Sequence, residues 1–187
     1  LLADLVERGL RSDRPTLFVI DGSKALRRAI RDVFGANAVV QRCQEHKIRN
    51  VVGTLPKDME TTVRKTMMAA YHTKEHARAK KMLQNLHRTL NASHPTAASS
   101  LKEGLDETLT VVRLGLTGAL LRTLRTTNAI ENLNGLMRKT SRNVKRWRNG
   151  SMVLRWSVAA IDEAKKSFRR IRGYRSCRSS QRLSSAL

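Results

Sequence analysis

A strand–helix–strand pattern near the N-terminus limits the folds open to this chain more than any other feature. The run "TLFVID" (16–21) is apolar and rich in β-forming residues, and "NAVVQRC" (37–43) has the same character. Between them, "GSKALRRAIRDVFG" places apolar residues at helical spacing and ends on a glycine. Two strands joined through a helix form a parallel pair with a crossover connection. The sequence therefore predicts a partial α/β core at residues 1–45, opened by a helix at residues 1–10.

The remainder of the chain predicts helices. Apolar residues recur at helical spacing through residues 46–124, where breaks at "GTLP", "NASHP" and "GLTG" suggest three or four helices. Another helix begins near Asn128, and a long helix covers residues 151–171. Its buried stripe is expected to be Val153, Leu154, Val158, Ile161, Ala164 and Phe168. The expected fold class is α/β with a large all-α insertion, predominantly helical overall.

This pattern predicts four regions. Residues 1–45 form the α/β core, residues 46–124 a helical insertion, and residues 125–172 the C-terminal core helices. Residues 173–187 are rich in Ser and Arg, a composition typical of a disordered basic tail.

The charge of the chain is strongly one-sided. It has 37 Lys and Arg against 15 Asp and Glu, a net charge of +22, which favours a polyanionic partner such as nucleic acid. In "RKTSRNVKRWRNG" an aromatic ring lies among cations that can neutralise phosphates, and such a ring can stack on an unpaired base. The alternative is a solvated basic face with Trp147 packed in the core. The candidate DNA-binding residues are Arg138, Lys139, Arg142, Lys145, Arg146, Trp147 and Arg148.

The cysteine content, the apolar runs and the N-terminal residues together predict the compartment. Two cysteines, Cys43 and Cys177, do not make a disulfide framework, which favours a reducing compartment. No run approaches the ~18 apolar residues of a membrane span. The N-terminal residues carry acids and do not have the pattern of a signal peptide. We expect a cytoplasmic protein with no membrane partner.

Two carboxylates are candidates for shared chemistry. Asp21 ends a predicted strand, and the carboxyl ends of parallel strands are where ligands bind in open sheets. Glu131 lies at the start of the helix near Asn128. Two divalent ions held by such oxygens, about 4 Å apart, can support phosphoryl transfer. The alternatives are structural: Asp21 can be a helix N-cap, and Asn128 with Glu131 has the spacing of a capping box.

Cys43 and His46 form a C-x-x-H pair that does not define a site by itself. Two ligands are too few for structural zinc, and no second pair has suitable spacing. A nucleophilic Cys43 would need a base and a substrate pocket, although Arg42, His46, Lys47 and Arg49 could supply a positive field. A structural role, with Cys43 closing the strand, is preferred over both. The other histidines, His72, His76, His87 and His94, have ordinary contexts.

Taken together, "FVIDGSKALRRAI", "VVQRCQEHKIRNV" and "LRTTNAIENLNGLMR" resemble the C-terminal catalytic portion of the Mutator-type transposases of bacterial insertion sequences. The resemblance covers residues 16–172. Three modest motifs in this order, with a helical block between the second and the third, make it specific.

The resemblance implies an RNase H-like core with an Asp-Asp-Glu triad and a helical insertion before the Glu. Asp21 would be the second Asp and Glu131 the Glu, and both would bind Mg²⁺ or Mn²⁺ in a two-ion site. It also implies DNA as substrate, at the element's ends and at the target, nucleoid association, and a homodimer in the full-length protein. Cys43, His46, Arg49, Asn50 and Asn128 would line the site.

The first Asp of the triad has no counterpart here, because no predicted strand precedes residue 16, and Asp4 and Asp13 lie in a helix and a turn. The chain also lacks a starting Met and opens inside a helical pattern. We expect a piece of a longer transposase that is inactive alone. Two alternatives remain, a non-catalytic basic nucleic-acid-binding module and a metal-free helical structural protein.

Overall fold

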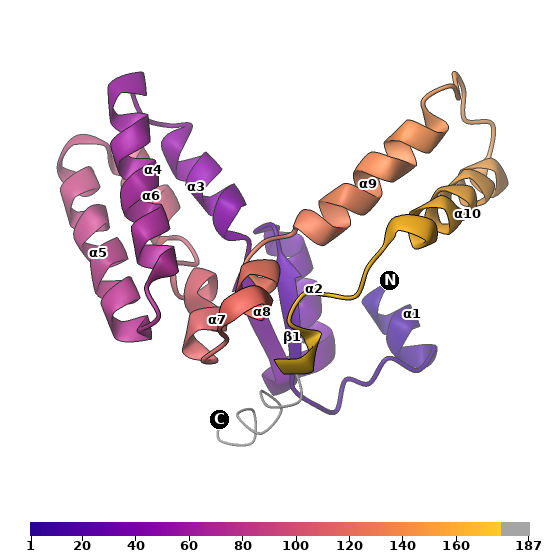
Figure 1. Cartoon of the computed structure of the whole chain (residues 1–187), viewed down its shortest axis with the longest axis horizontal. Helices are drawn as coiled ribbons and strands as arrows, with labels where there is room; N and C mark the ends of the chain where they lie inside the picture. Colours follow the sequence, from indigo (N-terminus) through magenta and orange to yellow (C-terminus); the bar gives the residue numbers. More distant parts are fainter. Residues whose placement is uncertain (177–187) are drawn as a thin grey trace. The chain divides into compact units, whose positions relative to one another are not determined.

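The computed structural model describes residues 1–176, which divide into two compact units (Figure 1). The first unit comprises residues 1–126 and, at the C-terminal end, residues 173–176. The second unit comprises residues 127–172. Each unit has its own arrangement of elements.

The predicted strand–helix–strand motif is confirmed in the first unit. Strand β1 (Thr16–Ile20) and strand β2 (Ala38–Arg42) pair in parallel, with Thr16 opposite Ala38 and Ile20 opposite Arg42. They are connected by α2 (Lys24–Phe34) and the 3-10 turn η1 (Gly35–Asn37). Helix α2 begins where the Ser23 hydroxyl accepts a hydrogen bond from Leu26 N–H (3.3 Å), and it ends at Gly35.

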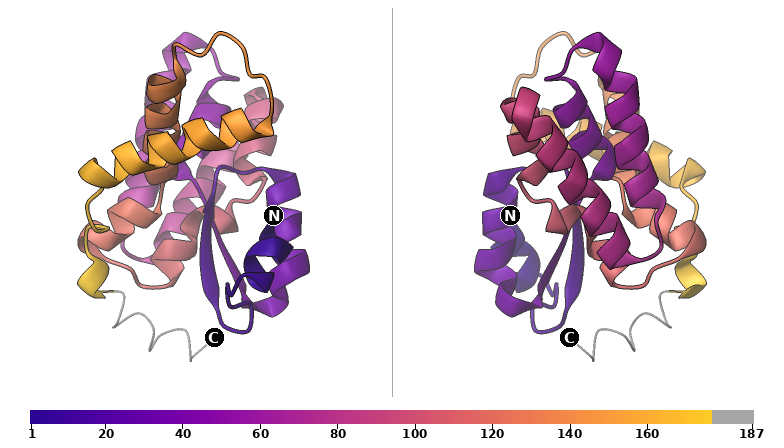
Figure 2. Two further views of the ribbon diagram at one scale, coloured as in Figure 1. Left: turned by 90° about the vertical axis from the view of Figure 1, so that its right-hand side faces the viewer. Right: turned by 90° about the vertical axis from the view of Figure 1, so that its left-hand side faces the viewer.

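The two faces of this small sheet are covered differently. Helix α2, with α1 (Leu2–Glu7), lies on one side of the strands, and the helical block lies on the other (Figure 2). On the α2 side, Ile20, Ile30 and Val40 form a buried cluster, with Phe18 and Phe34 in edge-to-face contact. On the other side, Leu17 packs against a cluster centred on Val111, Leu116 and Leu120. A sheet covered on both faces is what a parallel pair requires.

The helical block has six α-helices between residues 44 and 124, where the sequence predicted three or four. They are α3 (Gln44–Val52), α4 (Lys57–His72), α5 (His76–Ser93), α6 (Pro95–Lys102), α7 (Thr110–Arg113) and α8 (Gly118–Leu124), with the 3-10 turn η2 (Asp106–Leu109) before α7. The break between α4 and α5 contains neither Gly nor Pro, so the pattern did not reveal it. The largest buried cluster of the described residues lies here and includes Met67, Tyr71, Leu83, Leu90 and Leu101.

The second unit is a helical pair. Helix α9 (Asn128–Ser141) packs against α10 (Gly150–Ser167), and residues 142–149 connect them. The buried stripe predicted for α10 is wrong in most positions. Val153, Leu154, Val158 and Ile161 are 40–64% exposed, and Phe168, also exposed, lies just past the helix end. The buried residues of α10 are Ala160 and Ala164.

The C-terminal residues complete the described chain. Tyr174–Ser176 form the 3-10 turn η3. Most of the predicted basic tail, residues 177–187, lies outside the described residues. Among the residues that are described, no helix is both long enough and apolar enough to cross a membrane.

Candidate active site

The Asp21 carboxylate lies at the tip of β1, on an exposed turn that leads into α2. Its Oδ1 accepts a hydrogen bond from Ser23 N–H at 3.0 Å, an Asx turn that orients the side chain. Gly22 follows with φ 115°, a conformation that favours glycine. Ser23 is the N-cap of α2, so the alternative assignment of Asp21 as the cap is wrong.

The end of β2 lies beside this turn. Cys43 N–H donates to Ile20 O at 2.7 Å, which extends the parallel ladder by one residue. Cys43 itself is 1% exposed and is the N-cap residue of α3, in agreement with a strand-closing role. His46 is half-buried in the first turn of α3, whereas Arg49 and Asn50 are exposed. The spacing of three and four residues places Arg49 and Asn50 on the same side of α3 as His46.

Arg42 joins the Asp21 turn to the helical block, a contact that spacing along the chain does not reveal. Its guanidinium donates to Gly22 O at 2.8 Å and to Glu103 O at 3.0 Å. The side chain is only 9% exposed. A Cβ on Gly22 would lie 2.6 Å from Nη2, and a Cβ on Gly104 would overlap the same guanidinium. Both glycines therefore allow Arg42 to approach the backbone closely.

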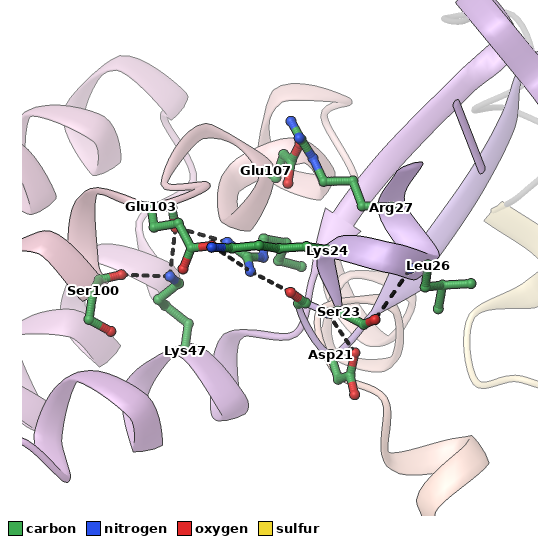
Figure 3. A network of polar contacts seen from close by, with 11 residues as sticks. Asp21, Ser23, Lys24, Leu26, Arg27, Lys47, Ser100, Glu103 and Glu107 are labelled. Carbon is green, nitrogen blue, oxygen red and sulfur yellow. Dashed lines mark hydrogen bonds and ion pairs between the residues drawn. The ribbon is translucent and has the colours of Figure 1, made fainter. Parts of the chain in front are cut away.

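Lys47 reinforces the same connection from α3. Its Nζ donates to Ser100 O and Glu103 O, both at 2.6 Å, at the end of α6 (Figure 3). Burial, and then the positive charge of Arg42, lower the pKa of Lys47 to about 8. The Glu103 carboxylate lies 3.7 Å from Arg42 Nη2 and 3.8 Å from Lys24 Nζ. Lys47 thus has a structural role, because it connects α3 to the end of α6.

The buried side-chain amide of Gln41, next to Arg42 on β2, connects the strand to η2 and α7. Gln41 is fully buried; its Nε2 donates to Thr108 O (2.9 Å), and its Oε1 accepts from Val111 N–H (2.9 Å). Polar side chains at the end of an otherwise apolar strand, "VVQR", were the one signal in the sequence that could have predicted this network. Because the partners of Gln41 lie 67 and 70 positions away, the spacing could not identify them.

Glu131 belongs to the second unit and lies in the first turn of α9. Thr127 is the N-cap residue and makes no side-chain cap hydrogen bond to the backbone, so the predicted capping box of Asn128 and Glu131 is wrong. Instead, Thr127 Oγ1 donates to Glu131 Oε1 at 2.6 Å. The side chains of Asn128 and Glu131 are exposed at this end of the helix. The Glu131 carboxylate is therefore oriented by the Thr127 hydroxyl.

The candidate DNA-binding residues gather at the other end of α9. Arg138 and Lys139 lie in its last turn and Arg142 is its C-cap residue. Lys145, Arg146 and Arg148 lie in residues 142–149, which we call the basic loop, and all six cations are exposed. Trp147 is 47% exposed, so the alternative that it packs in the core is wrong.

Comparison with known proteins identifies the family. The family model for the Mutator family of transposases matches residues 1–170, and the chain therefore belongs to this family. It is 27% identical to the transposase of insertion sequence IS6120 from Mycolicibacterium smegmatis, over 91% of this chain and 51% of that protein. Identity is 26% to the IST2 transposase of Acidithiobacillus ferrooxidans, over 89% of this chain and 55% of that protein.

A third relative, the IS406 transposase of Burkholderia multivorans, is 30% identical over 87% of this chain and 41% of its own length. The chain thus spans about half the length of the curated relatives it matches. No solved structure matches it. The family resemblance inferred from the three motifs is confirmed.

Proposed function

We propose that this chain carries two of the three catalytic carboxylates of a DDE transposase, Asp21 and Glu131. The observation that carries the proposal is the Asp21 turn. An exposed carboxylate, fixed by an Asx turn at the carboxyl end of a parallel strand, occupies the place where open α/β sheets bind ligands. Family membership supports the assignment, because Asp21 and Glu131 lie in the motifs that carry the resemblance.

The donor atoms fit a hard divalent cation. Asp21 and Glu131 are both carboxylates, and one oxygen of each is oriented by a hydrogen bond, from Ser23 N–H and from the Thr127 hydroxyl. Oxygen donors of this kind suit Mg²⁺ or Mn²⁺. When bound, the two ions would activate a water or a DNA 3′-hydroxyl and stabilise the leaving oxygen.

The chain's own residues would position DNA at these carboxylates. His46, Arg49, Asn50 and Asn128 would line the site, with Cys43 holding α3 against β1. The basic loop and the end of α9 would bind the phosphate backbone. We include in this proposal a homodimer of the longer transposase that acts on the element's ends and on target DNA.

We do not assign the third carboxylate to the acids near the N-terminus. Asp4 pairs with Arg8 (3.6 Å) within α1, and Asp13 pairs with Arg11 (2.6 Å) in the turn before β1. Neither residue is on a strand. We therefore expect this chain alone to bind DNA without cleaving it.

The test uses a full-length transposase that contains this chain. Asp21→Asn and Glu131→Gln should each reduce DNA strand transfer at least 100-fold and leave DNA affinity unchanged, because each removes a metal ligand but no phosphate contact. Asp32→Asn and Glu163→Gln are matched controls. Both acids are exposed, and each forms an ion pair inside its own helix, Asp32 with Arg28 and Glu163 with Lys166. Full activity of either Asp21→Asn or Glu131→Gln would reject the proposal.

A second candidate is a basic nucleic-acid-binding module without catalysis. The net charge of +22 and the six exposed cations at 138–148 favour it. The two candidates differ in one measurement on the chain itself. Broadening of the Asp21 and Gly22 amide resonances by Mn²⁺, lost in Asp21→Asn, is expected only if Asp21 is a metal ligand.

A further inference from the structure

The second unit contains an open pocket of about 890 Å³ between the basic loop and the start of α10. Its lining includes Lys145, Arg146, Trp147, Arg148, Met152 and Trp156. We propose that this pocket receives an unpaired DNA base, stacked on tryptophan, while the surrounding cations hold the adjacent phosphates. The proposal deepens the DNA-binding function proposed above and depends on it.

The local structure fixes the walls of the pocket. Asn149 is the N-cap of α10 and its Oδ1 accepts from Met152 N–H at 2.9 Å, and the loop residue Trp147 lies two residues before this cap. Met152 and Trp156 are four residues apart and share one side of α10. At the other end of the loop, Val144 N–H donates to Ser141 O at 2.9 Å and closes the turn after α9.

The chemistry of the lining favours a base over other ligands. Trp147 is 47% exposed and Trp156 is half-buried, so aromatic surface is accessible beside cations. Stacking on an aromatic ring requires a base whose face is free, which a paired base inside a duplex lacks. None of the described residues that line this pocket is acidic. A volume of roughly 300–1,000 Å³ is typical of small-ligand sites and is sufficient for a nucleotide.

A second basic pocket in the first unit does not have these properties. It lies beside α2 and is lined by Lys24, Arg27, Arg28 and Arg31, but also by Asp32, Glu103 and Glu107. Arg27 is ion-paired with Glu107, and Arg28 with Asp32. Its cations are therefore already neutralised in part, and no aromatic residue lines it.

The experiment uses intrinsic fluorescence, because Trp147 and Trp156 are the two tryptophans of the chain and both line the pocket. Three probes are compared: a blunt 20-base-pair duplex, the same duplex with a three-nucleotide 3′ overhang of thymidines, and that overhang with abasic sites. We expect stronger quenching and about 10-fold tighter binding for the thymidine overhang only, since stacking contributes ~1–3 kcal/mol per base.

Variants separate stacking from charge. Trp147→Ala should abolish the preference for the overhang, measured as the ratio of overhang affinity to blunt-duplex affinity, whereas Trp147→Phe should retain part of it. Phe168→Ala is the matched control, because Phe168 is 51% exposed and lies outside the pocket. Circular dichroism checks that each variant folds.

The outcomes distinguish this inference from the function on which it rests. Failure of the chain to bind any of the probes would reject DNA binding and the base pocket together. Equal binding of blunt and overhang probes, or an unchanged preference in Trp147→Ala, would overturn the base pocket while DNA binding stands. A marked preference for an RNA overhang of the same length would overturn the assignment to DNA.

Discussion

Arg42 connects two parts of the first unit through a single buried side chain. Its buried guanidinium bonds to the carbonyl beside Asp21 and to the carbonyl that ends α6. Loss of such a buried, charged hydrogen-bond donor leaves carbonyls unsatisfied and typically costs about 1–3 kcal/mol or more. Gly22 and Gly104 allow the guanidinium to approach, so the contact requires glycine at both positions as well as arginine at position 42.

Substitution of Gly104 by alanine tests this contact. Gly104 (φ 61°) lies against Arg42, whereas Gly115 (φ 66°) has nothing within 4 Å of its added Cβ. Gly115→Ala should lower the free energy of unfolding by about 1 kcal/mol from backbone strain alone. Gly104→Ala should cost about 1–3 kcal/mol more, because the methyl group displaces the guanidinium. Urea denaturation followed by circular dichroism measures both.

A double variant provides the control for the Gly104 prediction. In an Arg42→Ala background the added methyl group meets no guanidinium, so Gly104→Ala should cost the same as Gly115→Ala. Equal costs for the two alanines in the wild-type background would show that the close approach has no energetic consequence.

Lys47 makes stability depend on pH in a defined direction. Its pKa is about 8 in the folded chain against the ordinary 10.5, so between these values the unfolded chain binds more protons. The contribution of Lys47 to stability therefore rises as pH increases from 8 towards 10.5, and the cost of its buried charge is fully present below pH 8. The free energy of unfolding of wild type, relative to Lys47→Met, should increase by about 1–3 kcal/mol from pH 8 to pH 10.

The control for Lys47 is Lys65→Met, because Lys65 is exposed on α4. Its difference from wild type should not change over the same pH range. A flat difference for Lys47→Met as well would indicate that the buried amine titrates normally.

At the level of elements, the sequence predicted the strands and helices whose positions are set by residues close together in the chain. The sequence located β1, α2 and β2 to within about two residues, since each has a clear period and α2 is bounded by Ser23 and Gly35. The start of α9 at Asn128 was also correct. For α10, the predicted stripe was correct at Ala164, but its larger apolar residues are exposed and the second buried residue is Ala160. Close helix approach selects for small size, which a hydrophobic period does not reveal.

For the whole molecule, charge is the dominant property. Six exposed cations at 138–148 and a net charge of +22 should make duplex binding strongly dependent on salt. Each cation that contacts a phosphate should contribute about 0.9 to the slope of log affinity against log salt concentration. Arg142→Gln should lower this slope by about 1. Fluorescence anisotropy titrations at salt concentrations of roughly 50–200 mM measure it.

A charge change outside the proposed DNA surface provides the comparison. Arg64→Gln removes an exposed cation from α4 and should leave the salt slope as it is. Equal decreases for Arg142→Gln and Arg64→Gln would mean that the chain binds DNA through net charge and not through the end of α9 and the basic loop.

The sequence by itself determined the parallel strand–helix–strand motif, the basic character of residues 138–148 and the family, because each is written in local spacing or composition. Only the tertiary structure decided where Gln41, Arg42 and Lys47 find their partners and that Trp147 and Trp156 line one pocket. These contacts join side chains to groups that sequence spacing does not pair. Burial stabilises the three polar contacts, because a buried polar side chain without a hydrogen-bond partner would destabilise the fold.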